Sequence, residues 1–120
     1  MNATKVTFNY RMINASSCII DIQGELTMSA ESDFMSVYAQ ANRPTKLRTI
    51  ILNFGPLTYM NSSGIGLLVT FLVRLNREGQ KLAAFGLNEH YERVFELTRL
   101  NEAIHVYANE DEAVQVVTES

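Results

Sequence analysis

The sequence predicts an α/β fold, built as a mixed β-sheet in which an N-terminal hairpin precedes alternating strands and helices. Two β-type segments stand close together near the start, at residues 5–13 and 18–22. Residues 48–54 form a continuous apolar run of the kind that parallel sheets bury on both faces. Beyond it, strand-like and helix-like segments alternate, which favours a partly parallel sheet. We expect about four helices, one at each segment with helical spacing.

The first half of the chain contains the predicted hairpin and one helix. Residues 5–13 alternate apolar and polar side chains, as a half-buried strand does. The β-branched sequence CIIDI at 18–22 predicts a second strand, and the short NASS sequence between the two indicates a hairpin. Residues 29–42 open with a serine and repeat apolar side chains on one face, which predicts a capped amphipathic helix.

The second half begins with a predicted core strand at 48–54. A loop, PLTYMNSSG, follows it and leads into a helix whose leucine and phenylalanine side chains lie one turn apart. Gly79 ends that helix. The remaining predicted elements are strands at 81–87 and 103–107 and helices at 88–100 and 109–120. Both of these helices start with an asparagine and acidic residues, which suit a helix N-terminus.

Composition narrows the function. A chain of 120 residues with 47% apolar and 19% charged side chains is most simply one globular domain. Its net charge of −3, without a block of like charges, argues against direct nucleic-acid binding and against an anionic membrane surface. No apolar run is long enough to span a bilayer, and the first residues do not form a secretion signal. Cys18 is the only cysteine and has an apolar strand context, so we expect a buried thiol and a cytoplasmic protein.

Catalytic signatures are scarce. The chain has no G-x-S-x-G, S-x-x-K or P-loop sequence. Gly64 and Gly66 begin a dinucleotide fingerprint, but Val69 stands where the third glycine belongs. His90 and His105 have no cysteine or histidine at metal-ligand spacing, so we expect them at the surface or at a sheet edge. We therefore expect no enzyme activity, no cofactor and no metal site.

The candidate functional site is NSSG at residues 61–64. Asparagine and serine are preferred helix caps, so capping alone would explain the sequence. However, the segment joins the end of a buried strand to a helix, at the edge where α/β sheets form binding sites. Gly64 and Gly66 would leave the backbone open to another molecule. Tyr59 and Met60 place large apolar groups beside the serines, on a loop expected to be exposed.

A serine at this position could act as a charge switch. A phosphate there adds about −1.5 to −2 charge, which the free N–H groups and the dipole of a helix N-terminus tolerate. A partner docked over the site would have to desolvate that charge, which costs several kcal/mol unless a cation meets it. Phosphorylation could thus dissociate a complex without changing the fold.

Several motifs together resemble the STAS domain of the anti-sigma factor antagonist type. They are GEL at 24–26, LNF at 52–54, SSGIGLL at 62–68, RVFELTRL at 93–100 and NEDEAV at 109–114. The resemblance covers about residues 6–116 and implies a single STAS domain over residues 1–120. The order of strands and helices inferred above agrees with that fold independently.

The resemblance implies a non-enzymatic switch. In such families a serine-kinase anti-sigma factor phosphorylates the first serine of a D-S-S-G motif. The unphosphorylated antagonist binds that kinase and frees a sigma factor, and a PP2C-type phosphatase resets the switch. Carried over to this sequence, Ser62 is the phosphate acceptor and Ser63 the helix cap. The partner-binding residues that we expect are Thr27, Tyr59, Met60, Asn61, Ser62, Ser63, Gly64 and Gly66.

The sequence departs from the family pattern at three positions. Asn61 stands for the aspartate before the serines, Thr27 for the aspartate after GEL, and Arg99 for a glycine. The first two changes remove negative charge from the expected partner face. Two other functions stay open at this point: a STAS interaction module in another signalling pathway, and a small enzyme or nucleotide-binding protein that uses the SSGIG loop.

Overall fold

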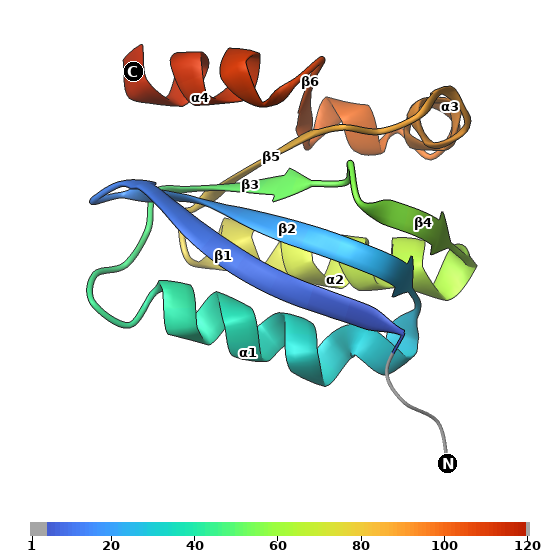
Figure 1. Cartoon of the computed structure of the whole chain (residues 1–120), viewed down its shortest axis with the longest axis horizontal. Helices are drawn as coiled ribbons and strands as arrows, with labels where there is room; N and C mark the ends of the chain where they lie inside the picture. Colours follow the sequence, from blue (N-terminus) through green and yellow to red (C-terminus); the bar gives the residue numbers. More distant parts are fainter. Residues whose placement is uncertain (1–4, 120) are drawn as a thin grey trace.

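The computed structural model describes residues 5–119, which form a six-stranded sheet with helices packed against it (Figure 1). The elements are β1 (Val6–Asn14), β2 (Ser17–Leu26), the 3₁₀ turn η1 (Met28–Ala30), α1 (Glu31–Ala41), β3 (Thr49–Asn53), β4 (Leu57–Met60), α2 (Ser62–Arg77), β5 (Lys81–Phe85), α3 (Glu89–Leu97), the 3₁₀ turn η2 (Leu100–Glu102), β6 (His105–Tyr107) and α4 (Glu110–Glu119). The predicted hairpin, the core strands and the four helices are confirmed. Within this part of the chain, no helix is long and apolar enough to cross a membrane.

The sheet is mixed, as predicted. Its strands follow the order β1-β2-β3-β5-β6, with β4 paired to β2 beside this path. Only the β1–β2 hairpin is antiparallel among the described strand pairs, and the others are parallel. The long strand β2 pairs with β3 through Ser17–Asp21 and with β4 through Gly24–Leu26. β4 therefore continues the sheet where β3 ends.

Strand β4 corrects the prediction of a loop between β3 and the serines. Leu57–Met60 pairs with β2 in parallel, with Met60 opposite Leu26. A four-residue strand that follows a proline has little sequence signal, and its hydrogen-bonding partner lies 33 to 34 residues earlier in the chain. As a consequence, the residues before Ser62 are fixed to the sheet.

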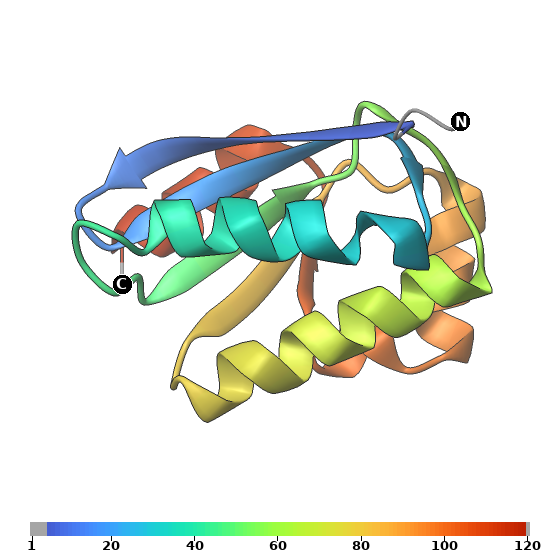
Figure 2. The same ribbon diagram turned by 90° about the horizontal axis from the view of Figure 1, so that it is seen from below.

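The main core lies between the sheet and the helices α1 and α2, which run side by side across one face (Figure 2). Three phenylalanine rings stack through it: Phe8 on Phe34 at 4.9 Å and Phe34 on Phe71 at 4.3 Å between ring centroids. Tyr91 and Phe95 of α3 join the same core. On the opposite face, α4 covers a smaller cluster that includes Ile19, Ile51, Ala83, Phe85 and Ala113. Apolar burial of this extent is the main force that holds such a fold together.

Other expectations about single residues are also met. The Cys18 side chain is fully buried, and burial raises the pKa of its thiol to about 12, so the thiol is neutral and packs as a small apolar group. His90 and His105 are exposed, the latter on the edge strand β6.

Arg99 adopts a left-handed backbone conformation with φ of 62°, which favours glycine, the residue of the family motif.

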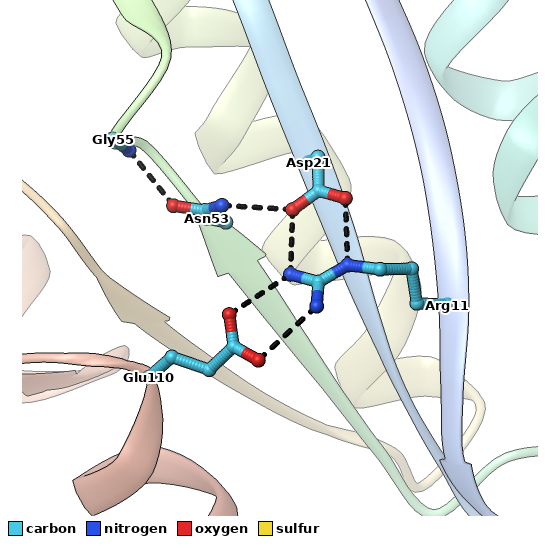
Figure 3. Close-up of polar contacts among 5 residues, drawn as sticks. All are labelled: Arg11, Asp21, Asn53, Gly55 and Glu110. Carbon is cyan, nitrogen blue, oxygen red and sulfur yellow. Dashed lines mark hydrogen bonds and ion pairs between the residues drawn. The ribbon is translucent and has the colours of Figure 1, made fainter.

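An ion-pair network attaches α4 to the hairpin (Figure 3). The Arg11 guanidinium donates two hydrogen bonds of 2.8 Å to the Asp21 carboxylate and two of 3.0–3.1 Å to Glu110 at the start of α4. Asn53 donates to the same Asp21 carboxylate at 2.7 Å and accepts from the Gly55 N–H at 2.9 Å. The network therefore joins β1, β2, β3, α4 and the turn that leads into β4.

Burial alone would raise the pKa of Asp21, but the hydrogen bonds from Arg11 and Asn53 outweigh it and hold this pKa below its ordinary value. A carboxylate whose pKa is lowered by folding stabilises the protein above its unfolded pKa of about 4, and that contribution is lost as the pH falls through the folded value. We expect the free energy of unfolding in urea to decrease below about pH 4, and to decrease less steeply in Asp21→Asn. Asp33→Asn, at an exposed position of α1, is the control and should follow the wild type. Equal pH slopes for all three proteins would contradict this role of Asp21.

Candidate functional site

The candidate site is the N-terminus of α2, where Asn61 caps the helix. Asn61 has an extended backbone, and its Oδ1 accepts a hydrogen bond of 2.9 Å from the Gly64 N–H. The expectation that Ser63 is the cap is therefore wrong. Ser63 is the second residue of the helix, two positions past the cap, and its hydroxyl donates to the same Asn61 Oδ1 at 2.8 Å.

The Ser63 hydroxyl joins two loops. While its proton points to Asn61, its oxygen accepts from the Met28 N–H at 3.0 Å. Met28 opens η1 on the connection from β2 to α1, and Thr27 directly before it caps that turn by accepting from the Ser29 N–H at 3.3 Å. The structure therefore brings Thr27 and Asn61–Ser63 together at one edge of the sheet.

Ser62 differs from its neighbour because its hydroxyl is free. The residue is exposed, and no group among residues 5–119 forms a hydrogen bond with its side chain. The backbone N–H groups of Ser62 and Ser63 also lack intrachain acceptors in this range, as expected for a first helical turn. The first turn of α2 contains no acidic side chain. An anion at Ser62 would thus meet unoccupied donors and the positive end of the helix dipole.

The two glycines have different surroundings. A Cβ atom on Gly64 would lie 2.3 Å from the Leu26 carbonyl oxygen and 2.9 Å from Cγ of Met60. The expectation that Gly64 opens the backbone to another molecule is therefore wrong, because Gly64 is buried and allows α2 to approach β2. A Cβ on Gly66 would meet nothing within 4 Å, so the helix surface there is open.

The apolar neighbours of the site also differ from the prediction. Tyr59 has an exposed fraction of 49%, as expected, whereas Met60 is only 5% exposed. Successive residues of a strand point to opposite sides, and in β4 the side of Met60 faces the main core. Met28, with an exposed fraction of 43%, is an apolar group at this edge that the sequence analysis missed. Its only signal was its place directly after Thr27.

A second residue missed from the sequence is Tyr91 on α3. Its hydroxyl accepts a hydrogen bond of 2.8 Å from the Met60 N–H and donates to the Met60 carbonyl at 3.4 Å. The site thus receives support from β2, β4 and α3 as well as from α2. Across residues 5–119, no group of three or more His, Cys, Asp or Glu side chains could hold a metal ion.

Comparison with known proteins identifies the class. The sequence model of the STAS domain family matches residues 8–113. The chain belongs to this family, and its mixed sheet with an N-terminal hairpin is the STAS fold.

The relatives of the chain have a common description. Proteins of Staphylococcus aureus named anti-sigma-B factor antagonist are 31% identical over 87 residues, which cover 72% of this chain and 80% of theirs. A Staphylococcus epidermidis protein of the same name is 29% identical over equal shares. Among solved structures, the anti-sigma factor antagonist SpoIIAA in its unphosphorylated form superposes with a TM-score of 0.76 and 25% identity, over 95% of this chain and 98% of that one. The phosphorylated form of SpoIIAA from Bacillus gives a TM-score of 0.71 and 26% identity, over 92% and 99%.

The two serines should respond differently to truncation. Ser63→Ala removes the acceptor of the Met28 N–H and a donor to Asn61, so we expect a loss of about 1 kcal/mol of stability and faster amide exchange at Met28. Ser62→Ala makes the same chemical change one residue earlier, where no hydrogen bond is lost, and should stay within about 0.5 kcal/mol of the wild type. Urea unfolding and hydrogen exchange measure both effects. Equal behaviour of the two variants would contradict the assignment of the hydrogen bonds.

Proposed function

We propose that this chain is an anti-sigma factor antagonist that binds a serine-kinase anti-sigma factor and is switched off by phosphorylation of Ser62. The observation that carries the proposal is the contrast between the serines: the Ser62 hydroxyl is exposed and unbound within residues 5–119, whereas the Ser63 hydroxyl is engaged on both sides. The names of the staphylococcal relatives and the similarity to SpoIIAA support the same function.

The proposed partner surface consists of Thr27, Met28, Tyr59, Asn61 and Ser62. Met28 and Tyr59 are its exposed large apolar side chains, and Gly66 extends the surface along α2. The surface does not include Ser63, Gly64 or Met60. These residues support it indirectly, because their contacts hold the backbone of the turn in place. Apolar side chains surrounded by polar groups are typical of protein–protein contacts.

The departures from the family motif are compatible with this function. Asn61 Oδ1 accepts from the Gly64 N–H, and Thr27 Oγ1 accepts from the Ser29 N–H, so both residues supply the caps that an aspartate would supply. Neither residue brings a negative charge close to Ser62. A phosphate on Ser62 therefore meets helix N–H donors without a carboxylate in the same turn.

The switch follows from the change in charge. Phosphoryl transfer forms a bond between the Ser62 oxygen and the γ-phosphorus of ATP, ADP leaves, and the hydroxyl proton passes to a base of the kinase. The modified surface carries about two negative charges where it was neutral. The kinase would then have to desolvate this charge to stay bound, so the complex dissociates and the anti-sigma factor returns to its sigma factor. A PP2C-type phosphatase would restore the free hydroxyl.

In this proposal the chain is a cytoplasmic regulator that binds neither nucleic acid nor membrane and performs no catalysis of its own. The alternative is a STAS interaction module that keeps the fold and binds its partner without modification. The neutral residues Asn61 and Thr27 are the observation that favours this alternative. The two functions differ in whether affinity depends on the charge at Ser62.

The proposal is tested by adding the serine-kinase anti-sigma factor of the same organism, with ATP, to the purified chain. We expect the intact mass to rise by one phosphate in the wild type and to stay constant in Ser62→Ala, since this variant lacks the acceptor. We also expect Ser62→Asp to bind the kinase at least about tenfold more weakly in calorimetry, because an unpaired charge would be buried. Ser36→Asp, at an exposed position of α1, is the matched charge control and should bind like the wild type.

Two outcomes would contradict the proposal. If the wild type gains no phosphate, the kinase does not phosphorylate Ser62 and cannot control binding in this way. If Ser62→Asp binds the kinase as tightly as Ser36→Asp does, the charge does not control the complex, and the interaction module is the better description.

A further inference from the structure

We propose that Tyr91 is a positioning residue for the Ser62 acceptor, acting through its hydroxyl on the Met60 backbone. The inference rests on the proposed function, because it assigns to α3 a part in presenting Ser62 to the kinase. Tyr91 lies outside the family motifs that point to the serines.

The first observation concerns the backbone at the end of β4, which has a strand partner on one side only. This strand has four residues and pairs with β2 alone among the described strands. At Met60, its last residue, the Tyr91 hydroxyl binds both backbone polar groups, accepting from the N–H at 2.8 Å and donating to the carbonyl at 3.4 Å. Tyr91 thereby does at this residue what a further strand would do.

The second observation is that Met60 contacts the acceptor turn directly. It precedes Asn61 and Ser62 in the chain, and its Cγ lies against Gly64, where a Cβ would be only 2.9 Å away. The Gly64 N–H in turn donates to Asn61 Oδ1. A shift of the Met60 backbone therefore moves both ends of the Asn61–Gly64 turn, and Ser62 with it.

The third observation is that Tyr91 itself is rigidly placed. Its side chain is 8% exposed within the main core, and its N–H donates to Asn88 Oδ1 at 2.9 Å, the cap of α3. A phenylalanine would fill nearly the same volume, so core packing does not require the hydroxyl. The role that the structure assigns to this hydroxyl is to hold Met60.

Positioning of this kind affects phosphoryl transfer as well as folding. A reacting hydroxyl must stay close to its target, and a displacement of about 1 Å can cost up to about 10²-fold in rate. Without the Tyr91 hydroxyl, the Met60 N–H and carbonyl lose their partner, and the turn has a wider choice of positions. We expect kcat/KM for phosphorylation of Ser62 to fall by about 3- to 30-fold, which is below this upper limit.

The test compares Tyr91→Phe with Tyr38→Phe. Tyr38 is the matched control because it is also buried and its hydroxyl also makes a hydrogen bond, to Gln80, on the side of α1. Both variants of the full chain are compared at a temperature where both are fully folded. The measurements are the kcat/KM of phosphorylation by the serine-kinase anti-sigma factor and the exchange of the hydrogen-bonded amides of Met60 and Gly64. We expect Tyr91→Phe to lose kcat/KM and to exchange faster at these residues, while Tyr38→Phe matches the wild type in both.

Equal kcat/KM for the two variants would overturn the inference, whether both match the wild type or both fall below it, because neither result singles out Tyr91. Unchanged exchange at Met60 and Gly64 in Tyr91→Phe would overturn it as well. If the wild type is not phosphorylated at all, the proposed function fails, and the exchange measurement alone decides whether Tyr91 positions the turn.

Discussion

The functional edge depends on one atom, Oδ1 of Asn61, which accepts hydrogen bonds from the Gly64 N–H and from the Ser63 hydroxyl. The first bond starts α2 at Ser62. The second orients the Ser63 oxygen toward the Met28 N–H and so ties the β2–α1 connection to the helix. Ser63 is used in this way, whereas no group among residues 5–119 engages the Ser62 hydroxyl at the positive end of the helix. Two adjacent serines thus acquire different roles from a single side chain.

This arrangement requires α2 to lie close to β2. Gly64 makes the approach possible, because any side chain there would collide with the Leu26 carbonyl. Strand β4 pairs with the same stretch of β2 and delivers the chain to the turn from the other side. In the proposed function, Ser62 is therefore held on a framework that a phosphate need not disturb. Such a surface would change its affinity for a partner through added charge, without a rearrangement of the fold.

The sequence was sufficient for the elements with a clear apolar pattern, which is alternating in the hairpin, continuous in β3 and helical in α2, and for the place of the NSSG segment at the start of α2. It was insufficient where a long-range contact decides the structure. β4 exists because β2 supplies its backbone partners, and this also turned Met60 inward. Asparagine and serine are about equally good caps, so composition could not distinguish Asn61 from Ser63. The contacts of Ser63 with Met28 and of Tyr91 with Met60 span 35 and 31 residues, so no local sequence pattern predicts them.

The central claim is that the hydrogen bonds of the turn select one serine over the other. The most direct measurement is to locate the phosphate by tandem mass spectrometry in the wild-type chain after reaction with the kinase. The account predicts that the phosphate is on Ser62 and that Ser63 is unmodified. A phosphate found on Ser63, whose hydroxyl is engaged by Asn61 and Met28, would contradict it.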